Sequence, residues 1–217
     1  MTTEPIVFYT GSGSPYGWRA WLALEHKGVP YTLNMLSFSA GETHAAPFLA
    51  VNPRGKVPAI VHEGTALWES NAIVEYLEDR FPEPRLWPAD VKDRARARRL
   101  VAENDAYLYP VLRRVIAETL YKAPDAVDQD ALAKAREELR GELERFAGEL
   151  RGPFFGGDAP DGADFTIFPS LAFIDRIEAR KPAFGVAADL PAALRAYLDR
   201  MTALPIVQTS WPPHWRG

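Results

Sequence analysis

The chain has no cysteine among its 217 residues. This absence excludes disulfide bonds, cysteine-ligated zinc, iron–sulfur clusters and catalysis by a cysteine nucleophile. Histidine is scarce as well: His26, His44, His62 and His214 are the four present, and none is paired at a spacing typical of metal ligands. We therefore expect no metal site.

Neither sign of charge dominates, and long hydrophobic runs are missing. The chain has 25 Lys and Arg against 29 Asp and Glu, a net charge of −4, whereas a nucleic-acid-binding face needs an excess of basic residues. No apolar run reaches the ~18 residues of a membrane span, and Met1–Pro5 lacks the basic start of a secretory signal. We expect no nucleic-acid partner, no membrane span and a cytoplasmic location.

The first 80 residues alternate between strand and helix patterns, which predicts an α/β domain. An apolar run ends at Thr10-Gly11, and Gly28 is a typical helix stop. An irregular or helical segment separates the second and third strands, and Glu63-Gly64 is a hairpin turn signal. Strands are expected at residues 6–9, 31–36, 57–61 and 66–68, and helices at 15–27 and 70–80.

The rest of the chain is predicted to be helical. Three prolines between Phe81 and Asp90 indicate an extended connection, because proline cannot continue a helix. Apolar spacing predicts helices at 92–122, kinked at Pro110, at 129–151 and at 191–201, and Asp161 with Asp164 is typical of the start of another. We expect an α/β domain at 1–80, a linker at 81–91 and an all-α domain at 92–217.

Ser14-Pro15 stands where the first strand leads into the first helix. Serine is a favoured N-cap and proline a favoured first helical residue, so a purely structural role accounts for the pair. The same geometry offers unpaired N–H groups, partial positive charge and a hydroxyl donor to an anion.

The glycines from Gly11 to Gly17 suggest another function. They follow a strand and open a helix, as a dinucleotide-binding fingerprint does. The spacing is GxGxxxG, Pro15 interrupts it, and the acidic residue expected about 20 positions later is missing. A dinucleotide-dependent enzyme is therefore a remote alternative.

A second group of candidate residues lies near the third strand and the second helix. Val57-Pro58 opens the strand, and a cis bond there would expose the backbone of Val57 to a ligand's main chain. At Glu69-Ser70 the hydroxyl and the helix N–H groups suit a carboxylate, while the Glu69 carboxylate suits an ammonium. Lys56 is either a solvated charge or a contact for a second carboxylate.

Five features follow one another along the chain: Ser14-Pro15, Lys56-Val57-Pro58, Glu69-Ser70, the proline-rich linker and a helical half. In this order they resemble the soluble glutathione transferases over essentially the whole chain. The resemblance implies a thioredoxin-like first domain (β-α-β-α-β-β-α) that binds glutathione, and an all-α C-terminal domain with a hydrophobic pocket for the electrophile. It further implies a homodimeric detoxification enzyme that uses glutathione as co-substrate.

Residue by residue, Ser14 matches the active-site serine of the serine-type classes. Pro58 matches the cis-proline, Val57 the residue whose backbone pairs with the cysteinyl part of glutathione, and Lys56 a glycyl-carboxylate contact of the tau class. Glu69 and Ser70 match the pair that binds the γ-glutamyl head group. Asp161 and Asp164 match the capping box of the helical domain, although the family usually has Ser or Thr at the first position. Further candidates to line the electrophile pocket are Tyr16, Trp18, Tyr107, Arg113 and Arg114.

The class within the family stays open. Trp18-Arg19 with Leu22-Ala23-Leu24 is similar to the zeta class, which includes maleylacetoacetate isomerase, but the zeta motif begins Ser-Ser-Cys where this chain has Ser14-Pro15-Tyr16. Ser14-Pro15 resembles tau or omega. Without cysteine, thiol transfer through a protein mixed disulfide is excluded.

The expected chemistry is attack by the glutathione thiolate on an electrophilic carbon, with Ser14 and the helix dipole favouring the thiolate. Conjugation, glutathione-dependent isomerisation and peroxidase activity are not separated by the sequence. The main alternative is a non-catalytic protein of the same fold that binds apolar ligands or a partner.

Overall fold

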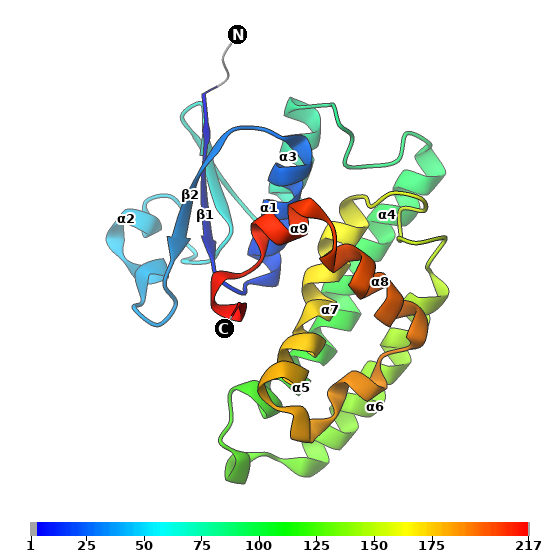
Figure 1. Cartoon of the computed structure of the whole chain (residues 1–217). Coiled ribbons are helices and arrows are strands. Elements are labelled where there is room, and N and C mark those ends of the chain that lie inside the picture. The colour runs from blue at the N-terminus through cyan, green and yellow to red at the C-terminus, as the bar shows by residue number, and fades with distance from the viewer. Residues whose placement is uncertain (1–3, 217) are drawn as a thin grey trace. The chain divides into compact units, whose positions relative to one another are not determined.

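The computed structural model describes residues 4–216 (Figure 1). The described residues do not include 1–3 and 217, which are the outer ends of the two expected domains. The start of the Met1–Pro5 stretch, considered above for a secretory signal, also lies outside them. The chain divides into two compact units. The first runs to Trp87 and also includes the chain from Pro205 onward, and the second is Pro88–Leu204.

A four-stranded sheet in the order β2-β1-β3-β4 forms the first unit. Its strands are β1 (Ile6–Gly11), β2 (Tyr31–Leu36), β3 (Ala59–His62) and β4 (Thr65–Trp68). The central strand β1 pairs parallel with β2 and antiparallel with β3, and β3 pairs antiparallel with β4. This mixed sheet differs from the mostly parallel sheet of a dinucleotide-binding fold. The dinucleotide interpretation of Gly11–Gly17 is therefore wrong.

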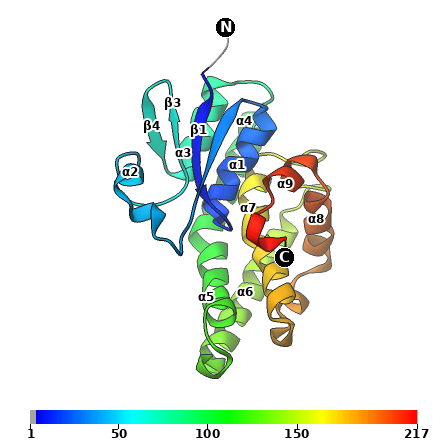
Figure 2. The same ribbon diagram turned by 60° about the vertical axis from the view of Figure 1, so that its left-hand side comes forward.

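Helices cover both faces of this sheet. Phe8 lies 6.4 Å, between ring centroids, from Trp21 on α1 (Pro15–Lys27). Its neighbour Tyr9 lies 5.6 Å from Phe48 on α2 (Ala46–Leu49). Successive strand residues point to opposite faces, so α1 and α2 lie on opposite sides. Helix α3 (Ser70–Arg80) packs against α1, as Figure 2 shows.

Helix α1 begins and ends where the sequence predicts. The Oγ of Ser14 accepts a hydrogen bond from Gly17 N at 3.1 Å, and Gly28 closes the helix with a left-handed φ of 62°. A Cβ at Gly17 would lie 2.1 Å from Thr10 Oγ1. Glycine at that position therefore allows the first turn of α1 to approach the end of β1 closely.

The second unit is helical, as predicted. Its helices are α4 (Val91–Glu103), α5 (Tyr109–Leu120), α6 (Gln129–Gly148), α7 (Gly162–Arg180) and α8 (Ala192–Thr202). Helix α7 contacts α4, α5 and α8, and its residues from Gly162 to Ile174 are all buried. A helix that is buried all round belongs at the centre of its unit.

The long helix expected at 92–122 is interrupted rather than only kinked. A π-helical turn, η2 (Asn104–Leu108), separates α4 from α5, with Tyr109 N donating to Asn104 O. Pro110 follows directly and has no N–H to continue the regular helical ladder. A wider turn at this point accommodates the missing donor.

The predicted capping box at the start of α7 is confirmed. Asp161 accepts from Ala163 N at 2.8 Å, and Asp164 accepts from Asp161 N at 3.0 Å. Asp164 also accepts from Phe155 N and Gly156 N, so both of its oxygens are used. Burial, and then the charge of Asp161, raise the pKa of Asp164 to about 7.

Other boundaries differ modestly from those expected. Val57-Pro58 stands just before β3 rather than inside it, and α6 ends at Gly148 rather than at 151. Residues from Pro205 onward, expected in the helical domain, pack in the first unit through α9 (Pro205–Ser210). Short helical turns lie at Glu42–His44, Pro124–Ala126, Pro182–Phe184, Val186–Asp189 and Pro213–Trp215.

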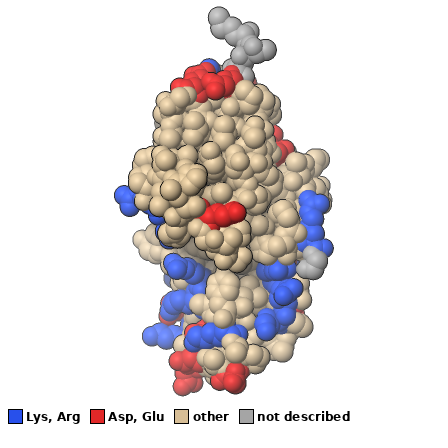
Figure 3. Space-filling view, turned by 90° about the vertical axis from the view of Figure 1, so that its left-hand side faces the viewer, with Lys and Arg blue, Asp and Glu red and all other residues tan. Residues whose placement is uncertain are grey.

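On the face drawn in Figure 3, uncharged residues cover most of the upper half of the view, and most of the Lys and Arg side chains gather in its lower half. Leu33 on β2 and Phe38 just after it are large apolar side chains that remain exposed. Within residues 4–216, no helix is long and apolar enough to cross a bilayer.

Candidate functional site

Ser14 lies at the carboxyl end of the central strand β1 and at the N-terminus of α1. Residues Gly11 to Ser14 form a tight turn, closed by a 3.0 Å hydrogen bond from Ser14 N to Gly11 O. The Ser14 hydroxyl oxygen accepts from Gly17 N, so its own proton remains available to donate. The result is a hydroxyl donor beside the positive end of a helix dipole, which suits an anionic group.

Ser70 is the first residue of α3, and Glu69 takes the cap position. Ser70 is therefore not the N-cap of α3. It accepts a hydrogen bond of 3.1 Å from the guanidinium of Arg19 on α1, and Arg19 also donates to Asn71 Oδ1. Arg19 is only 2% exposed. The buried Arg19 guanidinium therefore lies beside the N-terminus of α3. The helix dipole also favours a carboxylate at that position.

Glu69 adopts an unusual backbone conformation, with φ 68° and ψ 114°. A residue other than glycine costs about 1–3 kcal/mol in such a region, and positions of this kind concentrate at ligand sites. The Glu69 side chain is exposed at the start of α3. The Glu69 carboxylate therefore lies next to the backbone N–H groups at the N-terminus of α3, which can bind an anion.

The turn before β3 places Lys56, Val57 and Pro58. The buried side chain of Asn52 holds this turn, since its Nδ2 donates to Lys56 O at 2.6 Å and its Oδ1 accepts from Arg54 N at 3.0 Å. The Val57-Pro58 peptide bond is cis. Lys56 is exposed, with its side chain open to solvent.

Tyr16 and Trp18, two of the residues expected to line an electrophile pocket, differ in exposure. Tyr16 is partly exposed, and Arg19 lies over its ring, 5.4 Å from the centroid. Trp18 is 3% exposed, and its indole nitrogen donates to Ser210 Oγ at 2.9 Å. A ligand cannot reach the Trp18 ring while the segment beyond Ser210 stays packed on it.

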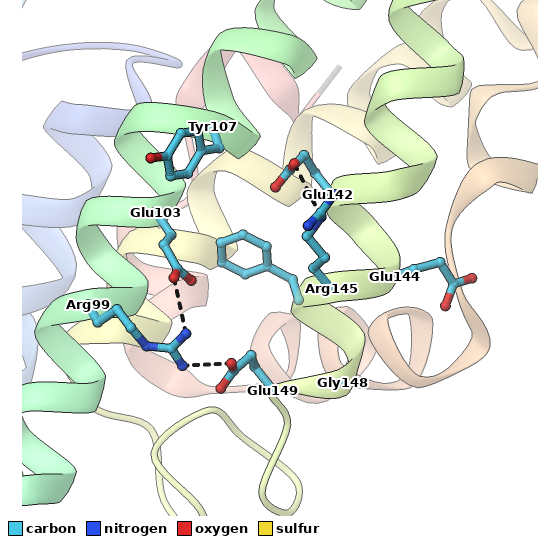
Figure 4. A pocket seen from close by; sticks show the side chains of 9 residues that line it. Arg99, Glu103, Tyr107, Glu142, Glu144, Arg145, Gly148 and Glu149 are labelled. Atoms are coloured by element: carbon cyan, nitrogen blue, oxygen red, sulfur yellow. Dashed lines mark hydrogen bonds and ion pairs between the residues drawn. The ribbon is translucent and has the colours of Figure 1, made fainter.

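The other three expected pocket residues belong to the second unit. Arg113 and Arg114 are exposed on α5, and Arg114 pairs with Glu138 on α6. Tyr107 is 59% exposed and lines a cavity of about 630 Å³ between α4 and α6 (Figure 4). Arg99 on α4 pairs with Glu103 of the same helix, and its ion pair with Glu149, just after α6, joins two walls of that cavity. The lining is mostly charged, whereas a hydrophobic electrophile needs an apolar one.

Two residues at the site were not predicted from the sequence to take part in binding, although Arg19 belongs to the Trp18-Arg19 pair that resembles the zeta class. Arg19 is an ordinary helical arginine by its spacing, and only the packing of α1 on α3 brings it to Ser70. Phe38 lies against Gly11, where a Cβ would come within 2.3 Å of its ring. Phe38 is 53% exposed, which makes it an accessible aromatic surface beside the Gly11–Ser14 turn. In the described part of the chain, no three His, Asp or Glu side chains gather as a metal site would need.

Comparison with known proteins identifies both halves of the chain. Residues 13–80 match the family model for the glutathione S-transferase N-terminal domain, and residues 129–200 match the model for the C-terminal domain. The chain is 32% identical to glutathione S-transferase A of Pleuronectes platessa, covering 94% of this chain and 90% of that protein. It is 31% identical to maleylacetoacetate isomerase of Pseudomonas aeruginosa, covering 94% of each.

The fold agrees with these relatives. The crystal structure of a glutathione S-transferase from the Antarctic clam Laternula elliptica superposes with a TM-score of 0.82 at 28% sequence identity. The match covers 98% of this chain and 94% of the clam protein. The chain therefore belongs to the soluble glutathione S-transferase family.

Proposed function

We propose that this glutathione transferase binds the γ-glutamyl head of glutathione at Glu69 and Ser70 and activates its thiol at Ser14. The observation that carries the proposal is the contact of Arg19 with Ser70. It places a buried positive charge and a hydroxyl at the N-terminus of α3, where a carboxylate gains charge-assisted hydrogen bonds. The neighbouring Glu69 carboxylate then faces the ammonium of the same amino-acid head.

The reacting atom in the proposed reaction is the sulfur of glutathione. A free thiol has a pKa of about 8.5 and is mostly protonated at neutral pH. A hydrogen bond from the Ser14 hydroxyl and the N-terminal dipole of α1 stabilise the thiolate. The thiol proton passes to solvent, the sulfur forms a bond to the electrophilic carbon, and the leaving group departs with its bonding electron pair. Ser14 keeps its own proton throughout.

The rest of glutathione is proposed to lie along the turn before β3. The Val57 backbone pairs with the cysteinyl part beside Pro58, and Lys56 binds the glycyl carboxylate. Exposure of the Lys56 side chain leaves it available for this contact, which is screened by solvent and therefore weak. Tyr16, whose ring is partly exposed two residues after Ser14, is proposed to contact the electrophile.

A second candidate activity is glutathione-dependent isomerisation, which the similarity to maleylacetoacetate isomerase of Pseudomonas aeruginosa favours. There the thiolate would add to a conjugated double bond and then be expelled, so glutathione would be regenerated unchanged. Consumption of glutathione distinguishes the two activities, because conjugation removes one thiol for each electrophile and isomerisation removes none. We further propose a cytoplasmic homodimer that acts in detoxification, and sedimentation of the purified protein tests the dimer.

Calorimetric titration with glutathione tests the binding site. Wild type is expected to bind saturably, and Ser70→Ala is expected to bind about tenfold more weakly, because it loses one hydrogen bond to a charged group. Ser39→Ala removes an exposed hydroxyl from the same unit and serves as the control. Absence of binding at millimolar glutathione would contradict the proposal and favour a non-catalytic carrier of apolar ligands.

An activity assay with a generic aryl halide tests turnover. Conjugation by wild type that depends on Ser14 supports a transferase. Tight binding of apolar ligands with no conjugation and no isomerisation would instead support the carrier.

A further inference from the structure

The last described residues of the chain are packed onto the N-terminal half of α1. Helix α9 contacts α1, and Figures 1 and 2 show the two side by side. Trp18 on α1 meets the rings of Trp211 and Trp215 edge-on, at centroid distances of 5.3 and 5.7 Å. Its indole N–H donates to Ser210 Oγ, and both residues are buried. A cluster of three tryptophans therefore anchors residues 210–216 to the first unit.

From this anchor, His214 reaches the turn that carries Ser14. Its Nδ1 lies 2.5 Å from Ser12 Oγ, and its Nε2 accepts a hydrogen bond of 3.0 Å from Trp215 Nε1. Because an indole nitrogen can only donate, Nε2 must be the unprotonated nitrogen. The proton is then on Nδ1, and the neutral imidazole donates to Ser12. Both ring nitrogens are thus fixed by partners.

The same imidazole also lies against the backbone of the turn. A Cβ at Gly13 would come within 2.7 Å of His214 Cε1 and 3.1 Å of Trp215 Nε1. Gly13 has a φ of 79°, as the third residue of a type II turn requires. Ser12 and Gly13 are the two central residues of the turn from Gly11 to Ser14. His214 therefore hydrogen-bonds to the side chain of Ser12 and packs against the backbone of Gly13.

We propose that His214 is a positioning residue for thiol activation, acting through Ser12 and the Gly11–Ser14 turn. The inference rests on the proposed role of Ser14 and deepens it. The direction in which Ser14 presents its hydroxyl depends on the conformation of a turn of four residues. All four of those residues are glycine or serine, and the imidazole from the far end of the chain restricts the two central ones. Without it, the turn samples other conformations, and Ser14 donates to the sulfur for a smaller fraction of the time.

The test measures the glutathione thiol itself. The thiolate absorbs in the ultraviolet and the thiol does not, so a pH titration of the protein–glutathione complex gives the pKa of the bound thiol. His214→Ala and Ser12→Ala are each expected to raise that pKa by about one unit, which lowers the thiolate fraction about tenfold at a pH well below the wild-type pKa. The kcat for an aryl halide should fall in proportion. The Kd for glutathione should change less than about twofold, since Arg19 and Ser70 are untouched.

Three further variants separate positioning from loss of structure. The double variant His214→Ala with Ser12→Ala should be no worse than His214→Ala alone, because Ser12→Ala removes a contact that His214→Ala has already removed. Trp215→Phe keeps a ring but loses the donor to Nε2, and should raise the thiol pKa by less. Thr209→Ala is the control: its exposed hydroxyl donates to Pro205 O within α9, and it should match wild type.

The possible results distinguish failure of this inference from failure of the proposed function on which it rests. If wild type binds glutathione with a lowered thiol pKa and both single variants match it in thiol pKa and kcat, the inference is wrong and the proposed function stands. If wild type binds no glutathione, the proposed function fails and the inference with it. If His214→Ala loses the coupled near-ultraviolet circular dichroism of its tryptophans, the segment has detached, and Ser12→Ala decides: an unchanged thiol pKa there overturns the inference.

Discussion

Arg19 Nη1 on α1 lies 3.1 Å from Ser70 Oγ on α3, with the Arg19 side chain almost fully buried between them. The contact joins the helix that begins at Ser14 to the helix that begins beside Glu69. Burial of a cation is costly unless its charge is used. A ligand carboxylate at the N-terminus of α3, as proposed above, would add an opposite charge close to this guanidinium.

Arg19→Gln is expected to weaken glutathione binding far more than it lowers kcat at saturation. Loss of a buried hydrogen bond to a charged group costs about 1.5–3 kcal/mol, which is a rise of about ten- to a hundredfold in Kd by calorimetry. Arg85→Gln removes an exposed arginine of the same unit and should leave Kd unchanged. An equal fall in kcat and in affinity for Arg19→Gln would argue against a head-group role.

Ser14→Ala should lower kcat while leaving the Kd for glutathione nearly unchanged, because the hydroxyl interacts with the sulfur and not with the carboxylates. The expected loss is about ten- to a hundredfold, the range for one hydrogen bond to a charged group. Ser14→Thr keeps a hydroxyl and a good N-cap, so it should recover much of the rate. Steady-state kinetics at saturating glutathione would refute the role of Ser14 if the alanine variant turned over at the wild-type rate.

Asp164→Asn should destabilise the second unit. The two carboxylate oxygens of Asp164 accept N–H groups of Phe155, Gly156 and Asp161. An asparagine replaces one acceptor with an NH₂ donor, so at least one buried N–H loses its partner, at a cost of about 1–3 kcal/mol. Urea unfolding measures the change, with Asp158→Asn at an exposed position of the preceding loop as control. Equal midpoints for the two variants would contradict this prediction.

His26 is expected to make the protein less stable in mild acid. Burial, partly offset by its hydrogen bond to Arg85 O, lowers the pKa of His26 from the usual 6.5. The unfolded chain then binds a proton more readily than the folded one, so the stabilising contribution of neutral His26 is complete above pH 6.5 and is lost as the pH falls below it.

The difference in unfolding free energy between wild type and His26→Gln isolates this effect. That difference should be constant above pH 6.5 and should turn against wild type at lower pH. Asp164 titrates in an overlapping range but is common to both proteins, so it cancels. A difference that stays the same on both sides of pH 6.5 for His26→Gln would show that burial does not perturb His26.

Local sequence signals were sufficient for most of the secondary structure. Ser14-Pro15 and Gly28 delimit α1, and Asp161 with Asp164 start α7, because caps and stops act within a few residues. The interruption before Pro110 was foreseen only as a kink. A π-helical turn depends on which carbonyl oxygens accept from the N–H groups before the proline, and the local sequence does not specify this.

The sequence by itself determined the alternation of strands and helices, the helix caps, and the order of motifs by which the family is recognised. Tertiary structure alone decided that Arg19 meets Ser70 and that His214 meets Ser12, pairs separated by 51 and 202 positions. It also decided that the chain beyond Pro205 packs with the first unit rather than with the helices that precede it. The physical reason is that caps and periodicity act over one or two turns of chain, whereas these contacts arise when distant apolar surfaces such as Trp18 and Trp211 are buried together.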